Sequence, residues 1–329
     1  MISGEYVVLD GAVALVAAVD ARALVRWAPN VDGSPPFLHG SPGSTRLPPE
    51  VLLTRRLAEV FTKMSPTTDD LTLDVSALRR GDHKLGLGSS AAAAAATAGA
   101  IFARAGRRLD DPSERRAMLE LALEGHRSVA PEGSGADVAA SVLGGLVRFR
   151  RDAQSGAVLE ATPVAFPAST QVRIVWTGHE ARTSELVRRV RGLSETDRGS
   201  YDRVMGALRE AATRFVEAVV ANDATAVVRA ADVHHHAMAA LGDAAGAPIV
   251  EASLARAAEL ARKHGGAAKP SGAGGGDVAL AFFADAEAAD AFAAECPQHG
   301  LSIVEAALDA EGVRVEEPPA ARAAQETEP

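Results

Sequence analysis

Three glycine-rich loops of this chain have residue types suited to binding an anionic ligand. The first loop, Lys84 to Ala92, reads KLGLGSSAA and runs into an alanine-rich stretch that predicts a helix. Glycines let backbone N–H groups approach a ligand without an obstructing Cβ, and the first N–H groups of a helix are unpaired and partly positive. The loop therefore predicts a phosphate cradle. The alternative is a tight turn with a serine N-cap.

We expect the nucleotide-binding residues of this cradle to be Lys84, Gly86, Leu87, Gly88, Ser89, Ser90 and Ala91. The two serines can donate to phosphate oxygens or ligate Mg²⁺ as neutral oxygens. The sequence does not say which serine touches a metal, and we take Ser90 as the candidate. The loop differs from the G-x-x-x-x-G-K-[ST] nucleotide loop, since no lysine precedes the serines.

The second loop, Gly133 to Asp137, reads GSGAD and opens another predicted helix. A carboxylate at this position can act as a general base on a substrate hydroxyl, or can stabilise the proton that is lost. The alternative is that Asp137 only complements the helix dipole. We take Asp137 as the candidate catalytic residue.

The third loop, Lys269 to Asp277, reads KPSGAGGGD and precedes an apolar segment that predicts a strand. Each glycine costs conformational entropy on folding, so a backbone that lies against a ligand explains the composition best. Lys269 supplies a cation and Ser271 a hydroxyl for an anionic group. The alternative is a flexible loop.

The bulk composition favours a two-domain globular protein that binds a small molecule. The chain has 329 residues, more than one typical core supports, and 47% of them are apolar. A net charge of −9 without a basic run argues against nucleic acid as a partner. The apolar run from Ala12 to Val19 is too short to span a bilayer, so no membrane partner is expected. A single cysteine, Cys296, fits a reducing cytoplasm.

Periodicity and turn residues predict the elements that hold these loops. In the first half they predict a hairpin of strands 6–9 and 14–19, a surface loop 28–50, helices 51–64, 91–105, 112–129 and from 137, and strands 71–75 and 146–150. In the second half they predict strands 172–176, 278–283 and 302–307, a helix from 183 to before 192, a mostly helical region 201–264 with a break at 242–248, and a helix 286–294. We expect Thr183 or Ser184 to cap its helix.

Three consecutive histidines, His234 to His236, are the most obvious metal-site candidate outside the loops. Consecutive helix residues point in different directions and cannot share one ion well. We therefore interpret them as residues of a surface helix.

With these three loops, the chain resembles the superfamily of galactokinase, homoserine kinase, mevalonate kinase and phosphomevalonate kinase (GHMP). Gly4-Glu5-Tyr6 with Asp10-Gly11 resembles its first motif, and the first and third loops resemble its second and third. The resemblance implies a ribosomal protein S5 domain 2-like domain over 1–165 and a ferredoxin-like domain over 166–315, with a disordered tail over 316–329. ATP and substrate would meet in the cleft between the two domains.

Within the superfamily, the motifs resemble the phosphomevalonate kinase branch. Tyr6 after the glutamate, the third loop, His126 with residues 133–139, and 176–178 with 183–184 carry this likeness. It implies transfer of the γ-phosphoryl of MgATP to 5-phosphomevalonate, with Asp137 catalytic, by a monomer or homodimer. Mevalonate kinase, another GHMP kinase and an inactive nucleotide-binding homologue are the alternatives. The substrate side would consist of Glu5, Tyr6, His126, Ser134, Gly135, Lys269, Ser271, Gly272, Ala273, Gly274 and Asp277.

Two departures from the family pattern stand out. The family usually begins with a strand that ends in Gly-Lys, just before the position of Met1, so we expect either that the coding sequence starts farther upstream or that the strand is missing. His126 stands where the mevalonate kinase branch has a Mg²⁺-binding glutamate, eleven residues before the catalytic aspartate, which leaves the Mg²⁺ ligands open. A phosphate acceptor is already ionised and needs no strong base, so Asp137 would then orient a lysine or Mg²⁺.

Overall fold

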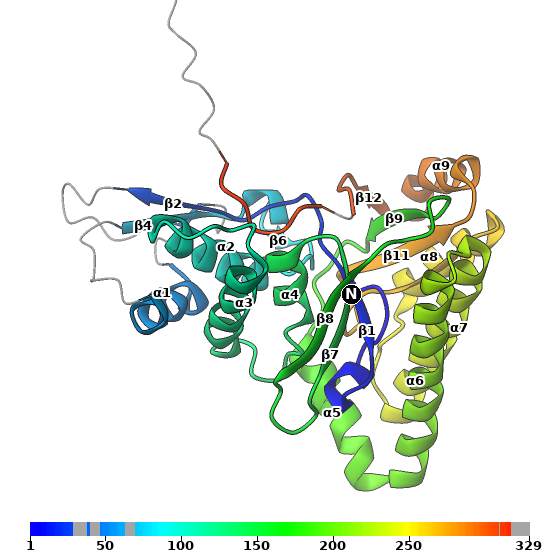
Figure 1. The fold of residues 1–329 in the computed structure, drawn as a ribbon. Helices are drawn as coiled ribbons and strands as arrows, with labels where there is room; N and C mark the ends of the chain where they lie inside the picture. The colour runs from blue at the N-terminus through cyan, green and yellow to red at the C-terminus, as the bar shows by residue number, and fades with distance from the viewer. Residues whose placement is uncertain (29–37, 40–46, 63–69, 309, 317–329) are drawn as a thin grey trace, which may run out of the picture.

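The computed structural model describes residues 1–28, 38–39, 47–62, 70–308 and 310–316. Two groups of elements lie beside each other, one built from the first half of the chain and one from the second (Figure 1). Both groups mix helices with sheets that are largely antiparallel, which confirms the expected α/β and α+β two-domain architecture. Among the described residues, no helix is long and apolar enough to cross a membrane.

Among its described residues, the first half packs four helices against two three-stranded sheets. The helices are α1 (Pro49–Thr62), α2 (Ser89–Arg104), α3 (Pro112–Arg127) and α4 (Ala136–Leu143). One sheet, antiparallel throughout, has the order β1 (Ala14–Ala17), β7 (Leu146–Arg151), β8 (Val158–Val164). The other has the order β2 (Leu24–Ala28), β4 (Asp70–Asp74), β3 (Leu38–His39), and its central strand β4 runs antiparallel to β2 and parallel to β3. Alanines of α2 at positions 91, 93, 94, 95 and 98 are buried, so neighbouring elements can approach its backbone closely.

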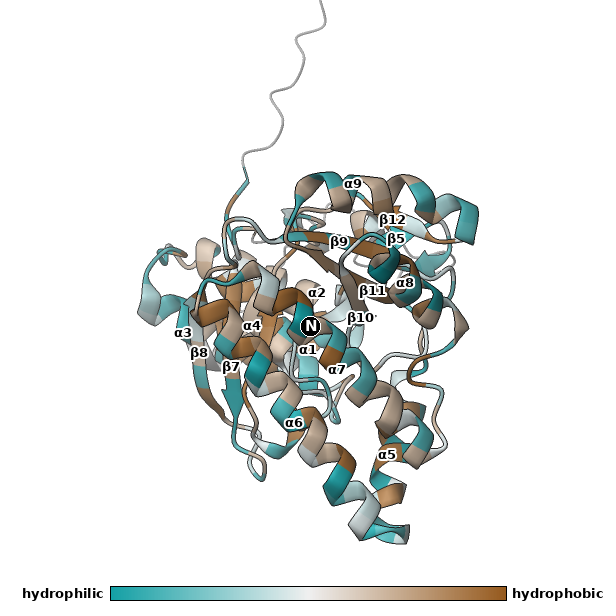
Figure 2. Ribbon diagram, turned by 90° about the vertical axis from the view of Figure 1, so that its right-hand side faces the viewer, coloured by the Kyte–Doolittle hydropathy of each residue, from teal (hydrophilic) through white to brown (hydrophobic). Residues whose placement is uncertain are grey.

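The second half is a four-stranded antiparallel sheet covered by helices. Its order is β10 (Ala267–Pro270), β11 (Val278–Phe283), β9 (Gln171–Trp176), β12 (Ser302–Val304). The helices are α5 (Thr183–Thr196), α6 (Arg198–Val220), α7 (Ala224–Ala245), α8 (Ala252–Lys263) and α9 (Ala286–Glu295). Every residue of β11 is buried, and the strand is coloured brown, for hydrophobic, in Figure 2. The third loop therefore leads directly into a strand that is fixed within the core.

The short elements complete the chain. They are the 3-10 helices η1 (Val7–Asp10), η2 (Ser76–Leu78) and η3 (Cys296–His299), and the hairpin strands β5 (Arg79–Arg80) and β6 (His83–Lys84). Among the described residues, most of the predicted helices and strands are present, with ends within a few residues of those expected. Six of the described strands had no prediction: β2, β3, β5, β6, β8 and β10. Lys269 and Pro270, expected in the third loop, are the last residues of β10.

The expected strand at residues 6–9 is wrong. Gly4 at φ 97° and Tyr6 at φ 61° turn the backbone, and Val7 then begins η1. The turn buries Tyr6 and Val7 against α5 and α6, in an apolar cluster that includes Leu186. Ser3, and not a strand over 6–9, pairs with Leu15 of β1.

The expected cap of α5 is also wrong, since Thr183 is the first helical residue and Arg182 precedes it without a side-chain capping bond. The predicted surface loop 28–50 lies largely outside the described residues. Its described residues contradict the prediction in part, since Ala28 ends β2, Leu38–His39 form β3, and Pro49 and Glu50 belong to α1. Residues 317–329 of the predicted disordered tail lie outside the described residues as well.

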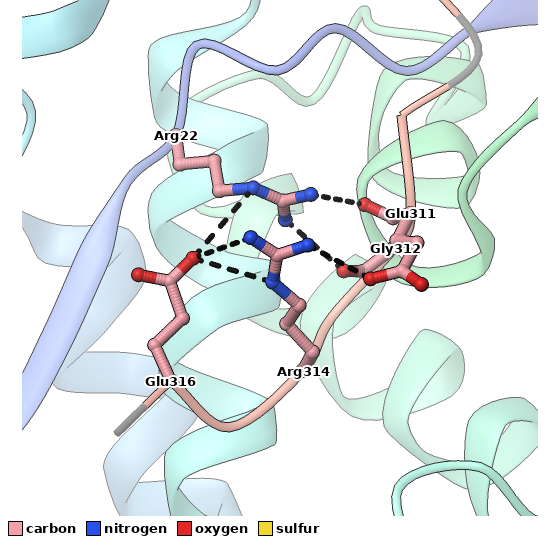
Figure 3. Close-up of polar contacts among 5 residues, drawn as sticks. All are labelled: Arg22, Glu311, Gly312, Arg314 and Glu316. Carbon is pink, nitrogen blue, oxygen red and sulfur yellow. Dashed lines mark hydrogen bonds and ion pairs between the residues drawn. The ribbon is translucent and has the colours of Figure 1, made fainter.

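After β12 the chain returns across the first half as a segment that we call the C-terminal strap, Ala310–Glu316 (Figure 1). Glu311 bridges Gly144, and Val313 fits against Gly99 of α2 so closely that a Cβ added to Gly99 would lie 2.2 Å from its Cγ1. Arg22 donates hydrogen bonds to the carbonyl oxygens of Glu311 and Gly312 (Figure 3). The strap thus ties the end of the second half to the first half.

Candidate active site

The structure brings the first loop between the other two. Gly86 touches the third loop, since a Cβ added to Gly86 would lie 2.4 Å from the Cβ of Asp277. Gly88 faces the second loop, since a Cβ added there would lie 3.7 Å from the Cβ of Asp137. Both glycines have positive φ, 72° and 78°, a conformation that L-residues rarely adopt. Gly88 and Asp137 are 49 positions apart in sequence and Gly86 and Asp277 are 191 apart, so distant segments form one site.

The start of α2 has the geometry of an anion site. Gly88 is the N-cap and provides no side-chain hydrogen bond to the helix. The alternative of a serine-capped turn is therefore wrong, because Ser89 is already the first helical residue. The backbone amides of the first turn receive no acceptor from the N-cap, and they lie at the positive end of a 16-residue helix.

Asp137 directs one carboxylate oxygen toward this helix start. It is the second residue of α4, after Gly135 as N-cap. Its Oδ1 accepts a hydrogen bond from the Val138 N–H at 3.0 Å, while Oδ2 would lie 3.9 Å from a Cβ added to Gly88. One oxygen is thus fixed by the protein, and the other faces the first loop.

A cavity of about 900 Å³ opens between the loops. That volume lies in the range of small-molecule and cofactor sites. The predicted site residues that line it are Glu5, Tyr6, Gly86, Leu87, Gly88, His126, Ser134, Asp137, Ser271, Gly272, Ala273 and Asp277. Those that do not line it are Lys84, Ser89, Ser90, Ala91, Gly135, Lys269 and Gly274.

The glycines of the third loop serve the protein's own packing more than expected. A Cβ added to Gly274 would lie 2.3 Å from the carbonyl oxygen of Ile249, and one added to Gly275 would lie 2.8 Å from Leu186 Cδ1. The expectation that a ligand explains all of these glycines is therefore wrong. Gly272 is different, because no atom lies within 4 Å of an added Cβ and the residue lines the cavity.

Asp277 and Tyr6 fix the third loop in place. Asp277 Oδ1 accepts from the Ala181 N–H at 3.1 Å, and its carbonyl oxygen accepts from the Thr177 hydroxyl at 2.9 Å. Burial raises the pKa of the Asp277 carboxyl. The Tyr6 hydroxyl donates to the carbonyl oxygen of Ala273 at 2.6 Å, and burial raises the pKa of that hydroxyl. These bonds give the cavity wall a defined shape.

We expected Lys269 to offer its charge to an anionic ligand, but the structure pairs it with another residue of the protein. Its side chain is 0% exposed, and Nζ donates to Glu5 Oε1 at 2.6 Å and to the carbonyl oxygen of Pro270 at 2.7 Å. In this structure its charge faces Glu5. Lys84 does not line the cavity; its backbone N–H donates to Glu180 Oε1 and its side chain is exposed to solvent.

The interpretation of all three histidines as surface residues is wrong for His234 and His235, which are buried. His234 Nε2 lies 3.2 Å from Glu5 Oε2, so Glu5 stands between Lys269 and His234. A sequence signal existed: His234 lies three and four residues from Ala231, Ala230 and Met238, on the apolar face of α7. Lys269 and His234 hold the pKa of Glu5 below its usual value, although burial alone would raise it.

The buried histidines predict a loss of stability in mild acid. Burial lowers the pKa of His234 from 6.5 to about 4, and burial lowers that of His235 likewise. Between pH 6.5 and about pH 4, His234 is protonated in the unfolded chain but neutral in the folded chain. The free energy of unfolding should therefore be highest above pH 6.5 and should fall as the pH drops toward 4. The expected cost for His234 is about 3 kcal/mol, measured by urea unfolding between pH 7.5 and pH 4.5. His234→Gln should flatten this dependence, whereas exposed His236→Gln should not. An equal slope in all three proteins would contradict the assignment.

A further acidic residue, Glu50, lies beside the site, and nothing in the sequence indicated that it would. Ser90 Oγ donates to Glu50 Oε1 at 2.9 Å, and Glu50 is only 6% exposed. A Cβ added to Gly125 would lie 3.0 Å from the Glu50 carbonyl oxygen, so the start of α1 packs beside the end of α3, next to His126. Within the described residues, no group of three or more His, Cys, Asp or Glu side chains could hold a metal ion. The hydroxyl of Ser90 and the free oxygen of Asp137 nevertheless suit Mg²⁺, which keeps waters and phosphate oxygens as most of its ligands.

Comparison with known protein families decides the assignment. Residues 53–145 match the family model described as GHMP kinases N terminal domain, and residues 215–301 match GHMP kinases C terminal. The chain belongs to the GHMP kinase family. This confirms the resemblance drawn from the three loops, and the N-terminal family match contains the first loop and Asp137.

Among characterised members of the GHMP kinase family, phosphomevalonate kinase of Streptomyces sp. (strain CL190) is 32% identical over 238 residues. That alignment covers 66% of this chain and 62% of the relative, so the match spans less than two thirds of the relative's length.

Two solved structures share the fold. A Lin0012 protein from Listeria innocua superposes with a TM-score of 0.82 at 22% identity, covering 93% of this chain and 94% of that one. Streptococcus pneumoniae phosphomevalonate kinase in complex with phosphomevalonate and AMPPNP superposes with a TM-score of 0.78 at 18% identity, covering 93% and 96%. At these identities the likeness establishes the fold.

Proposed function

We propose that this GHMP kinase transfers the γ-phosphoryl group of ATP to the phosphate of 5-phosphomevalonate, giving 5-diphosphomevalonate and ADP in the mevalonate route to isoprenoids. The observation that carries the proposal is the position of Gly88, at the uncapped start of α2 and opposite Asp137 Oδ2. The Streptomyces phosphomevalonate kinase at 32% identity supports the choice of acceptor. The pneumococcal structure with bound phosphomevalonate and AMPPNP has the same fold.

The main difficulty of this reaction is to bring two polyanions together. The acceptor phosphate is already ionised, so positive potential and orientation matter more than a strong base. In this chain the α2 N-terminus and the amides of the first loop supply that potential, because Lys269 is paired with Glu5. Mg²⁺, when bound, would neutralise charge on the β- and γ-phosphates. Asp137 Oδ2, which faces the first loop, would be the carboxylate oxygen that holds this cation.

We assign the acceptor to the part of the cavity lined by Tyr6, His126, Ser134, Ser271 and Gly272. His126 offers an imidazole and Ser134 a hydroxyl, and Gly272 offers backbone without a side chain. The hydroxyl protons of Tyr6 and Ser271 are already donated to the carbonyl oxygens of Ala273 and Met1, so these two residues would shape the wall of the acceptor site. The ATP-binding domain would be 1–165 and the second domain 166–315, with the cavity between them. We further propose a monomer or homodimer that works in the cytoplasm, in keeping with a free buried thiol at Cys296.

The test is ADP formation from MgATP with a panel of acceptors: 5-phosphomevalonate, mevalonate, galactose and homoserine. We expect ADP with 5-phosphomevalonate and background with the rest, together with 5-diphosphomevalonate as the product. ADP formed only with mevalonate or a sugar would overturn the acceptor. Nucleotide binding without ADP formation from any acceptor would overturn catalysis itself.

A further inference from the structure

The first turn of α2 carries a hydrogen bond that the reaction described above does not use. The Ser90 hydroxyl donates to Glu50 Oε1 at 2.9 Å. Glu50 comes from the first turn of α1, 40 positions earlier in sequence. It is 6% exposed, so this carboxylate is largely removed from water.

The chemistry of this bond restricts what Ser90 can do. A hydroxyl has one proton to donate and two lone pairs, whereas a carboxylate can only accept. Because the Ser90 proton is used on Glu50, the Ser90 oxygen has no proton left for a phosphate oxygen. It keeps its lone pairs, which suit a divalent cation. Of the two serines in the first loop, Ser90 is thus the one prepared as a cation ligand.

The negative charge of Glu50 also favours a cation at Ser90. Within the part of the chain that the structure describes, no Lys, Arg or His side chain forms an ion pair with Glu50. A largely buried carboxylate without a cation, one hydrogen bond from the start of the α2 helix, would repel phosphate. A divalent cation bound at Ser90 would compensate that charge.

Packing holds Glu50 in this position. The Thr54 hydroxyl donates to the Glu50 carbonyl oxygen at 2.6 Å, within the first turns of α1. Gly125 of α3 leaves no room for a side chain there, since an added Cβ would lie 1.8 Å from Thr54 Oγ1. The tight contact between α1 and α3 fixes the carboxylate against Ser90.

We propose that Glu50 is a positioning residue that makes the Ser90 oxygen a ligand of the divalent cation bound with the nucleotide. The proposal rests on the proposed function, since it requires that nucleotide phosphates lie at the first loop. Outer-sphere partners of this kind usually change metal affinity by about 10- to 100-fold when they are removed.

The test is Mn²⁺ binding to the full chain saturated with ADP, followed by electron paramagnetic resonance. We expect Glu50→Gln and Ser90→Ala each to weaken Mn²⁺ binding by about 10- to 100-fold, and the double variant to be no weaker than Ser90→Ala. The affinity for ADP without metal should be unchanged in Ser90→Ala and unchanged or tighter in Glu50→Gln. Glu185→Gln is the matched control, because Glu185 lies in the first turn of α5, pairs with Arg189 and is 32% exposed, whereas Glu50 is 6% exposed. Glu185→Gln should bind Mn²⁺ as the original chain does.

Thermal unfolding separates a folding defect from a site effect, and Glu50→Asp provides a second variant that keeps the charge. If Glu50→Gln unfolds, Glu50→Asp should fold and bind Mn²⁺ more weakly than the original chain. Unchanged Mn²⁺ affinity in the folded Glu50 variants would overturn the proposal, while normal ADP binding would leave the proposed function standing. Weaker metal-free ADP binding in Ser90→Ala would also overturn it, because Ser90 would then be a phosphate donor. A chain that binds neither ADP nor Mn²⁺–ADP would overturn the proposed function with it.

Discussion

Replacing Asp137 with alanine should lower the rate of ADP formation by about a hundredfold or more, the usual scale for a catalytic group. Its Oδ2 is the carboxylate oxygen that faces the first loop, and Oδ1 is already held by the Val138 N–H. Under the proposed function, removal of the carboxylate removes the oxygen that would hold a cation beside the nucleotide phosphates. The side chain is only partly buried, so the fold should survive the change.

The measurement is the steady-state rate with saturating MgATP and 5-phosphomevalonate, with circular dichroism to establish folding. Asp290→Ala is the matched control, because Asp290 is an exposed aspartate of α9. A loss of less than about tenfold in folded Asp137→Ala would remove Asp137 from the mechanism.

Replacing Lys269 with methionine should destabilise the protein by about 3–5 kcal/mol, the cost of leaving a buried charge without its partner. Glu5 and Lys269 are 1% and 0% exposed, and their 2.6 Å contact joins the N-terminal segment to β10. Without the ammonium, the Glu5 carboxylate would remain buried beside the neutral imidazole of His234. The third loop, which begins at Lys269, would lose one of the contacts that hold it in place.

Urea unfolding measures this cost, and a double variant shows its origin. Glu5→Gln combined with Lys269→Met removes both charges and should regain much of the stability lost in the single variant. Lys263→Met is the matched control, since Lys263 is a largely exposed lysine paired with Glu295, for which about 0–1 kcal/mol is expected. A Lys269→Met variant as stable as Lys263→Met would show that the buried pair contributes little.

The parts of the site that the sequence predicted are those governed by local rules. The first loop and its helix follow from glycine conformation and alanine propensity, and the structure places Gly88 at the start of α2 with φ 78°. Asp137 just inside α4 follows from the same kind of pattern. The meeting of the loops was inferred from the family resemblance, because no local rule joins segments so distant in sequence.

The parts that the sequence did not predict depend on contacts between distant segments. Glu50 is an ordinary first-turn glutamate until α1 packs against α2 and presents it to Ser90. Lys269 seemed available to a ligand because its partner, Glu5, lies 264 positions away. Gly274 seemed to serve a ligand because the backbone of Ile249, which it touches, is equally invisible in the local sequence.

The central claim is that nucleotide phosphates bind the backbone amides of Gly86 to Ser90, facing Asp137. A crystal structure of the chain with Mg²⁺, AMPPNP and 5-phosphomevalonate tests it most directly. We expect density for the β- and γ-phosphates at the start of α2, with the acceptor phosphate between them and the third loop. Density for the triphosphate elsewhere in the cavity, with the first loop unliganded, would contradict it.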